Sequence, residues 1–162
     1  MVDRSEREGT ETVQIPPFRL EGDLGFPAET ARGLVLFAHG SGSSRLSPRN
    51  TYVASALRQA GLATLLFDLL RESEEADRAN VFNIELLADR LLAATAWARS
   101  FEATHSLPLG YFGAGTGAAA ALTAAARLGE EIGAVVSRGG RPDLAGRALP
   151  RGPAPPPLIV GG

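Results

Sequence analysis

The sequence predicts an α/β protein with a mostly parallel sheet and helices on both faces. Short apolar runs alternate along the chain with longer segments whose apolar residues recur at helical spacing, which is typical of successive β-α units. The apolar runs are continuous, as they are in strands that are covered on both faces. With 162 residues, 44% of them apolar, the chain is long enough to bury a core. We therefore expect one three-layer domain.

The N-terminal part is predicted to be a tail followed by an antiparallel hairpin. Residues 1–12 are rich in charge, so we expect a flexible tail there and place the domain at residues 13–162. Within residues 13–27, short extended segments flank Glu21-Gly22-Asp23, which predicts the hairpin turn. The adjacent prolines Pro16-Pro17 are expected at a sheet edge, because proline cannot donate to the ladder.

The rest of the chain is predicted to alternate between strands and helices. Ser47 and Pro48 are typical of an N-cap and a first helical residue, and Gly61 ends that helix. The predicted strands are residues 33–40, 63–70, 107–112, 133–137 and 157–160. The predicted helices are residues 50–60, 84–101, 116–128 and, as a short piece, 143–149. We interpret the charged residues 71–80 as a solvated connector and the proline-rich residues 151–157 as a surface loop.

The composition excludes several classes of function. The chain has 16 basic and 18 acidic side chains, so its formal charge is −2, and neither nucleic acid nor an anionic membrane is an expected partner. It has no cysteine and no lysine, which excludes disulfides, thiolate nucleophiles, Schiff bases and a P-loop. Two histidines, His39 and His105, are too few for a His-rich metal site, so we expect no metal and no cofactor.

The location of the protein is predicted from its ends and its apolar runs. No run approaches the roughly 20 apolar residues that span a bilayer. The charged N-terminus is unlike a signal peptide. Basic residues that are all arginine, in a chain rich in alanine and glycine, are typical of a GC-rich genome. We expect a bacterial, cytoplasmic protein.

Three segments are expected beyond the carboxyl ends of the strands, where open α/β sheets place their sites. They are His39–Ser44, Asp68 and Gly113–Gly117. The third segment, Gly-Ala-Gly-Thr-Gly, lies between a predicted strand and a small-residue helix, which is the context of the nucleophile elbow G-x-S-x-G. Gly113 and Gly117 fill the positions where strand and helix approach too closely for a Cβ atom. Gly115 stands at the nucleophile position.

These motifs resemble α/β-hydrolases of the dienelactone-hydrolase-like group. The matching residues are VQIPPFRLEGDLGFP, LVLFAHGSGSSRLSPRN, the strand with Asp68, LGYFGAGTGAAAAL, AVVSRGGRPDLAG and LIVGG. The resemblance implies a serine esterase or lactonase scaffold that acts on a small ester or lactone with Ser, an acid and His in that chain order. It also implies an oxyanion hole formed by the backbone N–H groups of Thr116 and Ser41.

The sequence departs from the family pattern at the catalytic triad. Gly115 stands in place of the serine, and the family's acid and histidine would follow Gly162, where the sequence ends. We therefore expect a catalytically disabled hydrolase, inactive or only weakly active. The last strand and helix of the resembled fold are also missing, so residues 157–160 are predicted to form an exposed edge through which the chain self-associates.

Several other residues are candidates for part of the site. The pocket candidates are His39, Gly40, Arg45, Arg49 and Asp68. A pair between His39 and one of Ser41, Ser43 or Ser44 could replace the triad, or the histidine could only shape its loop. Asp68 could equally brace that loop, and the two arginines could bring positive charge to the oxyanion hole or stay solvated.

The side chains of three further polar residues are interpreted as having no catalytic role. The side chain of Thr116 is expected to point away from the position of attack. His105 precedes a strand and is expected on the surface at the opposite, amino end of the sheet. Asp143 could stand in for the missing acid, but an N-cap of the short helix is the interpretation we favour.

Two other classes of function fit the same turn. A non-catalytic small-molecule binding module would share every feature of a disabled hydrolase. Gly113, Gly115 and Ala118 also match G-x-G-x-x-A, which predicts an NAD(P)-binding domain. That fingerprint usually opens the first β-α-β unit and is followed by an acid near the end of the next strand, whereas here the next strand ends in Ser137-Arg138.

Overall fold

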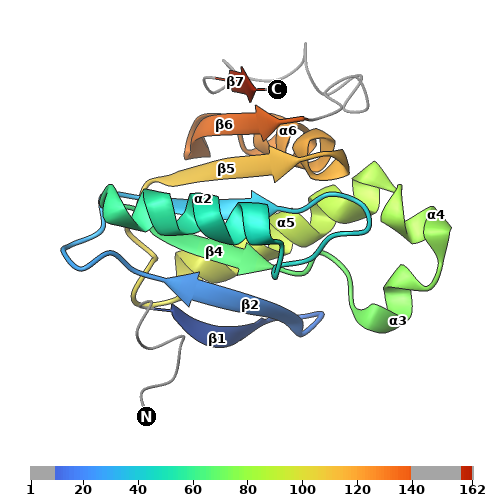
Figure 1. Ribbon diagram of the computed structural model, residues 1–162, viewed down its shortest axis with the longest axis horizontal. Helices are drawn as coiled ribbons and strands as arrows, with labels where there is room; N and C mark the ends of the chain where they lie inside the picture. The colour runs from blue at the N-terminus through green and yellow to red at the C-terminus, as the bar shows by residue number, and fades with distance from the viewer. Residues whose placement is uncertain (1–9, 140–157, 162) are drawn as a thin grey trace.

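A seven-stranded sheet forms the centre of the structure (Figure 1). The computed structural model describes residues 10–139 and 158–161. The strands are β1 (Thr10–Ile15), β2 (Leu20–Gly25), β3 (Leu34–Ala38), β4 (Ala63–Phe67), β5 (Leu109–Ala114), β6 (Ile132–Arg138) and β7 (Leu158–Gly161). Their order is β1-β2-β4-β3-β5-β6-β7. The pairs β1·β2 and β2·β4 are antiparallel and the other pairs are parallel, which confirms the predicted mostly parallel sheet.

Helices cover both faces of the sheet, as predicted (Figure 1). The helices are α2 (Pro48–Gln59), α3 (Glu72–Glu75), α4 (Arg78–Val81), α5 (Ile84–Ser100), α6 (Thr116–Leu128) and the 3-10 helix η1 (Gly129–Glu131). On the face under α2, Ala54 packs with Phe37, Leu66 and Phe112 from the sheet. The opposite face, under α5 and α6, holds the larger apolar cluster.

The helix signals in the sequence are confirmed. The Ser47 side chain accepts a hydrogen bond from the Asn50 N–H at 3.3 Å, so it caps α2, and Pro48 is the first residue of that helix. The predicted apolar stripe of α5 is buried, and its members are Leu87, Leu91, Ala94 and Ala98. Helix α6 has the predicted bounds, and its alanines from Ala118 to Ala121 are fully buried against the sheet.

Two predictions about the N-terminal hairpin are wrong. The turn lies at residues 16–19, and Glu21-Gly22-Asp23 is inside β2. The reason is that a proline pair cannot contribute N–H groups to a ladder, so the pair occupies the turn. Strand β1 also begins at Thr10, whereas residues 1–12 are predicted as tail. Threonine and glutamate side chains are accommodated there because β1 is an outer strand with an exposed face.

The prediction that residues 71–80 form a solvated connector is wrong in part. The segment contains the single-turn helix α3 and most of α4. Glu74 forms two hydrogen bonds with the guanidinium of Arg90, at 2.8 and 2.6 Å, and Arg90 is only 5% exposed. Arg90 in turn lies over the ring of Phe18, 4.0 Å from its centroid. This charged segment is therefore fastened to α5 and to the hairpin turn.

Some predictions concern residues outside the described ranges. They are the tail up to residue 9, the short helix at residues 143–149 with Asp143, and the loop at residues 151–157. Among the helices of the described ranges, none combines the length and the apolar character needed to cross a membrane.

Candidate functional site

The turn between β5 and α6 has the backbone of a nucleophile elbow. Gly115 precedes the first residue of α6 with φ 59° and ψ −128°, a region that favours glycine. A Cβ atom built on Gly115 would meet one described heavy atom within 4 Å, the Cα of Gly40 at 3.4 Å. The elbow is thus formed and has room for a side chain, but it carries no nucleophile.

The two flanking glycines are required for steric reasons, as the sequence predicts. A Cβ atom on Gly113 would lie 2.6 Å from the Cα of Ala118. A Cβ atom on Gly117 would lie 2.0 Å from the carbonyl oxygen of Ala38. Both contacts are with backbone, so a side chain at either position would push helix α6 away from the sheet.

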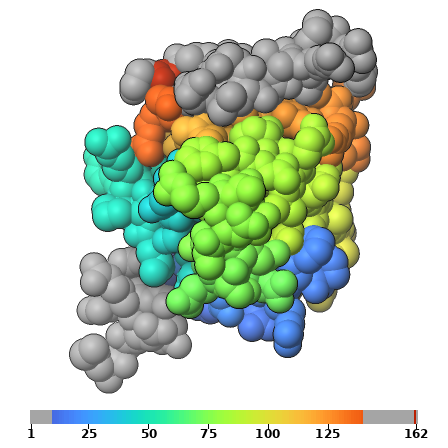
Figure 2. Space-filling model, turned by 90° about the vertical axis from the view of Figure 1, so that its right-hand side faces the viewer, coloured from blue at the N-terminus to red at the C-terminus, as the bar shows by residue number. Residues whose placement is uncertain are grey.

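A cavity of about 400 Å³ opens beside the elbow. One wall is the loop after β3, residues 39–43, and Thr116 lies next to it. The opposite wall comes from α3, α4 and the start of α5, with Glu75, Arg78, Val81, Phe82 and Leu87. In Figure 2 the carboxyl edge of the sheet faces the viewer, and the green segment that contains α3 and α4 covers its centre.

The residues of the predicted oxyanion hole both line this cavity. Thr116 is the first residue of α6, so its N–H has no acceptor within the helix. Ser41 is exposed in the loop after β3. The two segments touch through their backbones, since a Cβ atom on Gly40 would lie 3.0 Å from the carbonyl oxygen of Ala114. This arrangement places the N-terminal end of α6, which carries the positive end of the helix dipole, beside the cavity.

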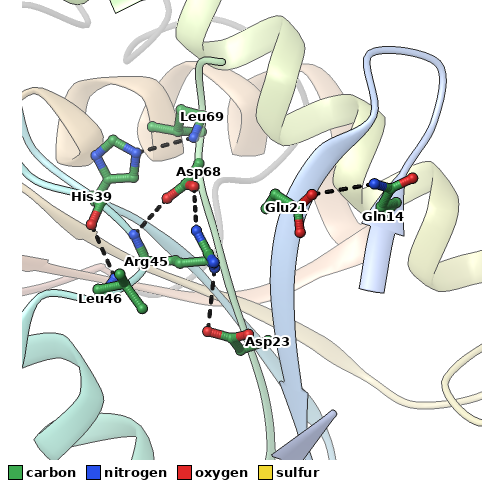
Figure 3. A network of polar contacts seen from close by, with 9 residues as sticks. Gln14, Glu21, Asp23, His39, Arg45, Leu46, Asp68 and Leu69 are labelled. Carbon is green, nitrogen blue, oxygen red and sulfur yellow. Dashed lines mark hydrogen bonds and ion pairs between the residues drawn. The ribbon is translucent and has the colours of Figure 1, made fainter. Parts of the chain in front are cut away.

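His39 lines the cavity, but both nitrogens of its ring form hydrogen bonds with backbone groups (Figure 3). Nε2 accepts a hydrogen bond from the Leu69 N–H at 3.0 Å. Nδ1 lies 2.9 Å from the Gly40 carbonyl oxygen, and the network assigns the proton to Nδ1, which donates to that oxygen. Both nitrogens are therefore engaged, and the ring joins the loop after β3 to the loop after β4.

A pair between His39 and a neighbouring serine is not formed in the structure. The ring nitrogens bond Leu69 and Gly40, and neither bonds Ser41, Ser43 or Ser44. The Ser44 hydroxyl accepts from the Leu46 N–H at 3.1 Å instead. The arrangement corresponds to the other interpretation of the sequence, in which the histidine shapes its loop.

Asp68 and Arg45 form a brace beside the cavity (Figure 3). Asp68 accepts hydrogen bonds from the backbone N–H of Arg45 at 2.8 Å and from its Nη1 at 2.6 Å. The Nε atom of the same arginine lies 3.4 Å from a carboxylate oxygen of Asp23. Burial raises the pKa of Asp23 above its ordinary value, while Arg45 opposes that increase. The three residues fix the loop after β3 to β2 and to the end of β4.

The remaining sequence-predicted residues lie away from the cavity. Arg45 lines a different hollow of about 690 Å³, between α2 and β2. Arg49 is exposed on α2, and His105 is exposed ahead of the amino end of β5, as expected for a surface residue. Within the described residues, no group of three or more His, Asp or Glu side chains is arranged to hold a metal ion.

The wall formed by α3 and α4 is absent from the sequence-based prediction of the site. Its one cation is Arg78, whose guanidinium lies 5.7 Å from the centroid of the Phe82 ring. Its apolar members include Val81 and Phe82, and Phe82 is 52% exposed. The available signal is this Val-Phe pair, because it follows the charged run directly and precedes α5. An apolar pair at that place is a candidate for a pocket wall.

The sheet order, the elbow and the loop after β3 define an α/β-hydrolase scaffold. A crystal structure of dienelactone hydrolase from Anabaena variabilis superposes with a TM-score of 0.84 and 53% sequence identity, over 95% of this chain and 74% of that one. The chain belongs to the dienelactone hydrolase family. An α/β serine hydrolase without a lid from Xanthomonas campestris has a TM-score of 0.73 at 23% identity, over 93% of this chain and 69% of that one, which shows the fold alone.

The curated sequences that this chain matches are longer than it is. Two Mycobacterium tuberculosis proteins, each named "Putative phosphoribosyl transferase", are 60% identical to it over 154 residues. The match covers 94% of this chain but 34% of each relative, so the chain spans about a third of their length. No family model matches the sequence.

Proposed function

We propose that this chain is a non-catalytic binding member of the dienelactone hydrolase family, which holds a small ester or lactone without forming an acyl-enzyme. The observation that carries the proposal is Gly115 in the elbow conformation, with φ 59° and ψ −128°. Covalent catalysis needs a nucleophile at that position and a base within hydrogen-bonding reach. Glycine supplies no nucleophile, and His39 is held by Leu69 and Gly40.

In this proposal, the chain keeps the features that would bind a substrate. The cavity of about 400 Å³, the N–H at the start of α6 and the loop after β3 surround the elbow. In serine hydrolases, the oxyanion hole and substrate binding alone leave roughly 10³–10⁴-fold acceleration over water when the triad is removed. Weak residual turnover is therefore compatible with the proposal, and efficient turnover is not.

The name of the mycobacterial relatives calls for a separate proposal. The part of those proteins that matches this chain has a hydrolase scaffold here, and it makes up 34% of their length. We propose that any phosphoribosyl transfer by those relatives belongs to the part that this chain does not match. In this proposal, the chain is a ligand-binding module that works together with a separate phosphoribosyl-transferring part.

A fluorophosphonate probe tests the proposed function directly, because it labels activated serine and threonine hydroxyl groups. The chain is incubated with the probe, and its intact mass and peptide map are measured alongside turnover of 4-nitrophenyl butyrate. We expect no added mass and no saturable turnover. Labelling of Thr116 or Ser41, or turnover that saturates and disappears when the labelled residue is changed, would overturn the proposal.

A further inference from the structure

We propose that residues 71–82 form a cover that opens away from the cavity as one body, and that the ion pair between Glu74 and Arg90 is the latch that keeps it closed. The cover carries α3 and α4, so it includes most of the wall opposite the loop after β3. Its opening would let a ligand enter and leave the cavity. This control would act on entry whether the ligand reacts or is only held.

The first observation is that the hydrogen bonds of the cover are nearly all internal. The N–H of Glu74 donates to the carbonyl oxygen of Arg71 at 2.9 Å, and the side chain of Asn80 donates to the carbonyl oxygen of Glu74 at 3.0 Å. Within the described part of the chain, the hydrogen bonds of the cover that reach outside residues 71–83 are the two between Glu74 and Arg90. The cover can therefore keep its own structure when it separates from the rest of the domain.

The second observation is that the cover buries little apolar surface. None of residues 71–82 is fully buried: Glu74, Asn80 and Val81 are half-buried, and the others are exposed. Val81 is the residue of the cover that packs against the main apolar cluster. A segment with few buried apolar contacts opens at a lower free energy than the core beside it. The pair with Arg90 is thus a large part of what holds the cover in place.

The third observation is that the partner of Glu74 belongs to the fixed part of the domain. Arg90 lies in α5, is 5% exposed and has its guanidinium 4.0 Å from the centroid of the Phe18 ring in the hairpin turn. Its Nη1 and Nη2 atoms donate to the two carboxylate oxygens of Glu74 at 2.8 and 2.6 Å. Such a bidentate contact is directional, and partial burial protects it from screening by salt. It therefore holds the cover in one position.

The fourth observation is that the chain is anchored on both sides of the cover. Before it, the Leu69 N–H donates to Nε2 of His39 at 3.0 Å. After it, the Asn83 side chain accepts from the Leu86 N–H at 3.1 Å and caps α5. Figure 1 shows α3 and α4 to the right of the sheet, outside its stacked layers. A rotation of the cover can therefore be absorbed at its first and last residues, as in other hinged segments.

Thiol labelling tests the opening of the cover, because the chain has no cysteine and an introduced one is its sole thiol. Leu87→Cys is the reporter, since Leu87 lies in α5, lines the cavity and is 3% exposed. Ala88→Cys is the matched control, at the next residue of the same helix, which is fully buried and outside the described lining of the cavity. The rate of reaction with N-ethylmaleimide is measured for each. We expect Leu87→Cys to react faster, with little dependence on low urea concentrations, since opening the cover exposes little surface.

Removing the latch should speed up the labelling of Leu87→Cys. Arg90→Met keeps an apolar side chain in α5 and removes both hydrogen bonds to Glu74. We expect the labelling rate to rise about tenfold or more, because the closed state alone loses these charge-assisted bonds. Arg99→Met is the matched control, since it breaks an ion pair of the same helix with Glu131, outside the cover, and should leave the rate unchanged.

The urea dependence of Leu87→Cys labelling with Arg90 intact decides the outcome if Arg90→Met fails to fold. Equal rates and equal urea dependence for Leu87→Cys and Ala88→Cys would overturn the proposal, because both sites would then open by global unfolding alone. Labelling of Leu87→Cys at the rate of a free thiol would also overturn it, since the cavity would then be open without any motion. An unchanged rate in a folded Arg90→Met chain would show that the pair with Glu74 is not the latch.

Discussion

The three glycines of the elbow act in different ways. Gly113 and Gly117 have negative or extended φ, and their restriction is steric, because the atoms that a Cβ would meet belong to the backbone of β3 and α6. Gly115 has open space and a positive φ, so its restriction is conformational. Replacing each glycine should therefore have a different cost, which a series of variants can measure.

We expect the larger loss of folding stability when Gly117 is replaced. In Gly117→Ala the new Cβ would lie 2.0 Å from the carbonyl oxygen of Ala38, so α6 has to move. We expect the free energy of unfolding to fall by about 3 kcal/mol or more in urea denaturation. The matched control is Gly110→Ala in β5, where the closest atom, the carbonyl oxygen of Ala134, would be 3.4 Å away. A similar loss for both variants would contradict the steric explanation.

We expect a smaller loss of folding stability when Gly115 is replaced. Gly115→Ser and Gly115→Ala both place a Cβ at φ 59°, which costs of the order of 1–3 kcal/mol in the free energy of unfolding. The two variants should lose the same amount, because the penalty arises in the backbone and not from the hydroxyl. The measurement is again urea denaturation. A serine variant as stable as the parent chain would show that this turn is not strained.

Some of these features of single residues can be predicted from the sequence and others cannot. The glycine spacing and the small residues after it predict the elbow, because a close strand-to-helix approach leaves a local pattern. The burial of the Thr116 hydroxyl without a partner among the described residues, and the engagement of His39 by Leu69, could not be predicted in this way. They depend on contacts between residues that are distant in sequence, such as the 30 positions between His39 and Leu69.

Two ion pairs hold the segments that form the cavity. Arg45 and Asp68 fix the loop after β3, and Glu74 and Arg90 fix α3 to α5. Neither pair is apparent from sequence, because the partners are 23 and 16 residues apart and lie on different elements. Continuous apolar runs and caps predict β3, β4, α2 and α6 well, since those signals are local. The hairpin turn and the α3–α4 wall depend on packing, which explains why the predictions failed there.

The Glu74 pair predicts a pH dependence of stability. Its hydrogen bonds with Arg90 lower the pKa of Glu74 from about 4.5 to about 2. A depressed pKa in the folded state means that the pair stabilises the chain fully above pH 4.5 and loses this contribution as the pH falls toward 2. Glu74→Gln should therefore lower the free energy of unfolding at pH 7 by about 3 kcal/mol, because Arg90 stays buried without its partner.

The difference between Glu74→Gln and the parent chain should shrink as the pH is lowered from 4.5 toward 2. Urea denaturation at several pH values measures it. The control is Glu72→Gln, which changes an exposed residue of the same helix and should not alter stability. A difference that stays constant over this pH range would contradict the assignment of the shift to the Arg90 pair.

At the scale of the whole molecule, the sheet has two outer strands in the described part of the chain. Strand β1 pairs with β2 alone, and β7 pairs with β6 alone. The exposed residues of β1 are polar, namely Glu11, Thr12 and Gln14, which disfavours pairing with another sheet. Strand β7 has the sequence Leu-Ile-Val-Gly, which contains no charged residue.

We propose that the chain self-associates through the edge formed by β7. Unpaired backbone groups next to apolar residues favour addition of another strand. Light scattering coupled to size exclusion should show a mass that rises above 16.9 kDa with concentration. The mass should return to that of a monomer in moderate urea before the chain unfolds. A monomer at every concentration would contradict the proposal.

The contact between Gly40 and Gly115 has a consequence for the history of this site. Because the backbone of the elbow and its facing loop are already in place, the difference between this chain and one with a nucleophile at residue 115 is a single side chain. Codons for glycine and serine differ by one base in several cases, so the exchange is within reach of one mutation in either direction. A nucleophile at residue 115 could therefore be gained or lost without rebuilding the elbow, although covalent catalysis would still need a base within hydrogen-bonding reach.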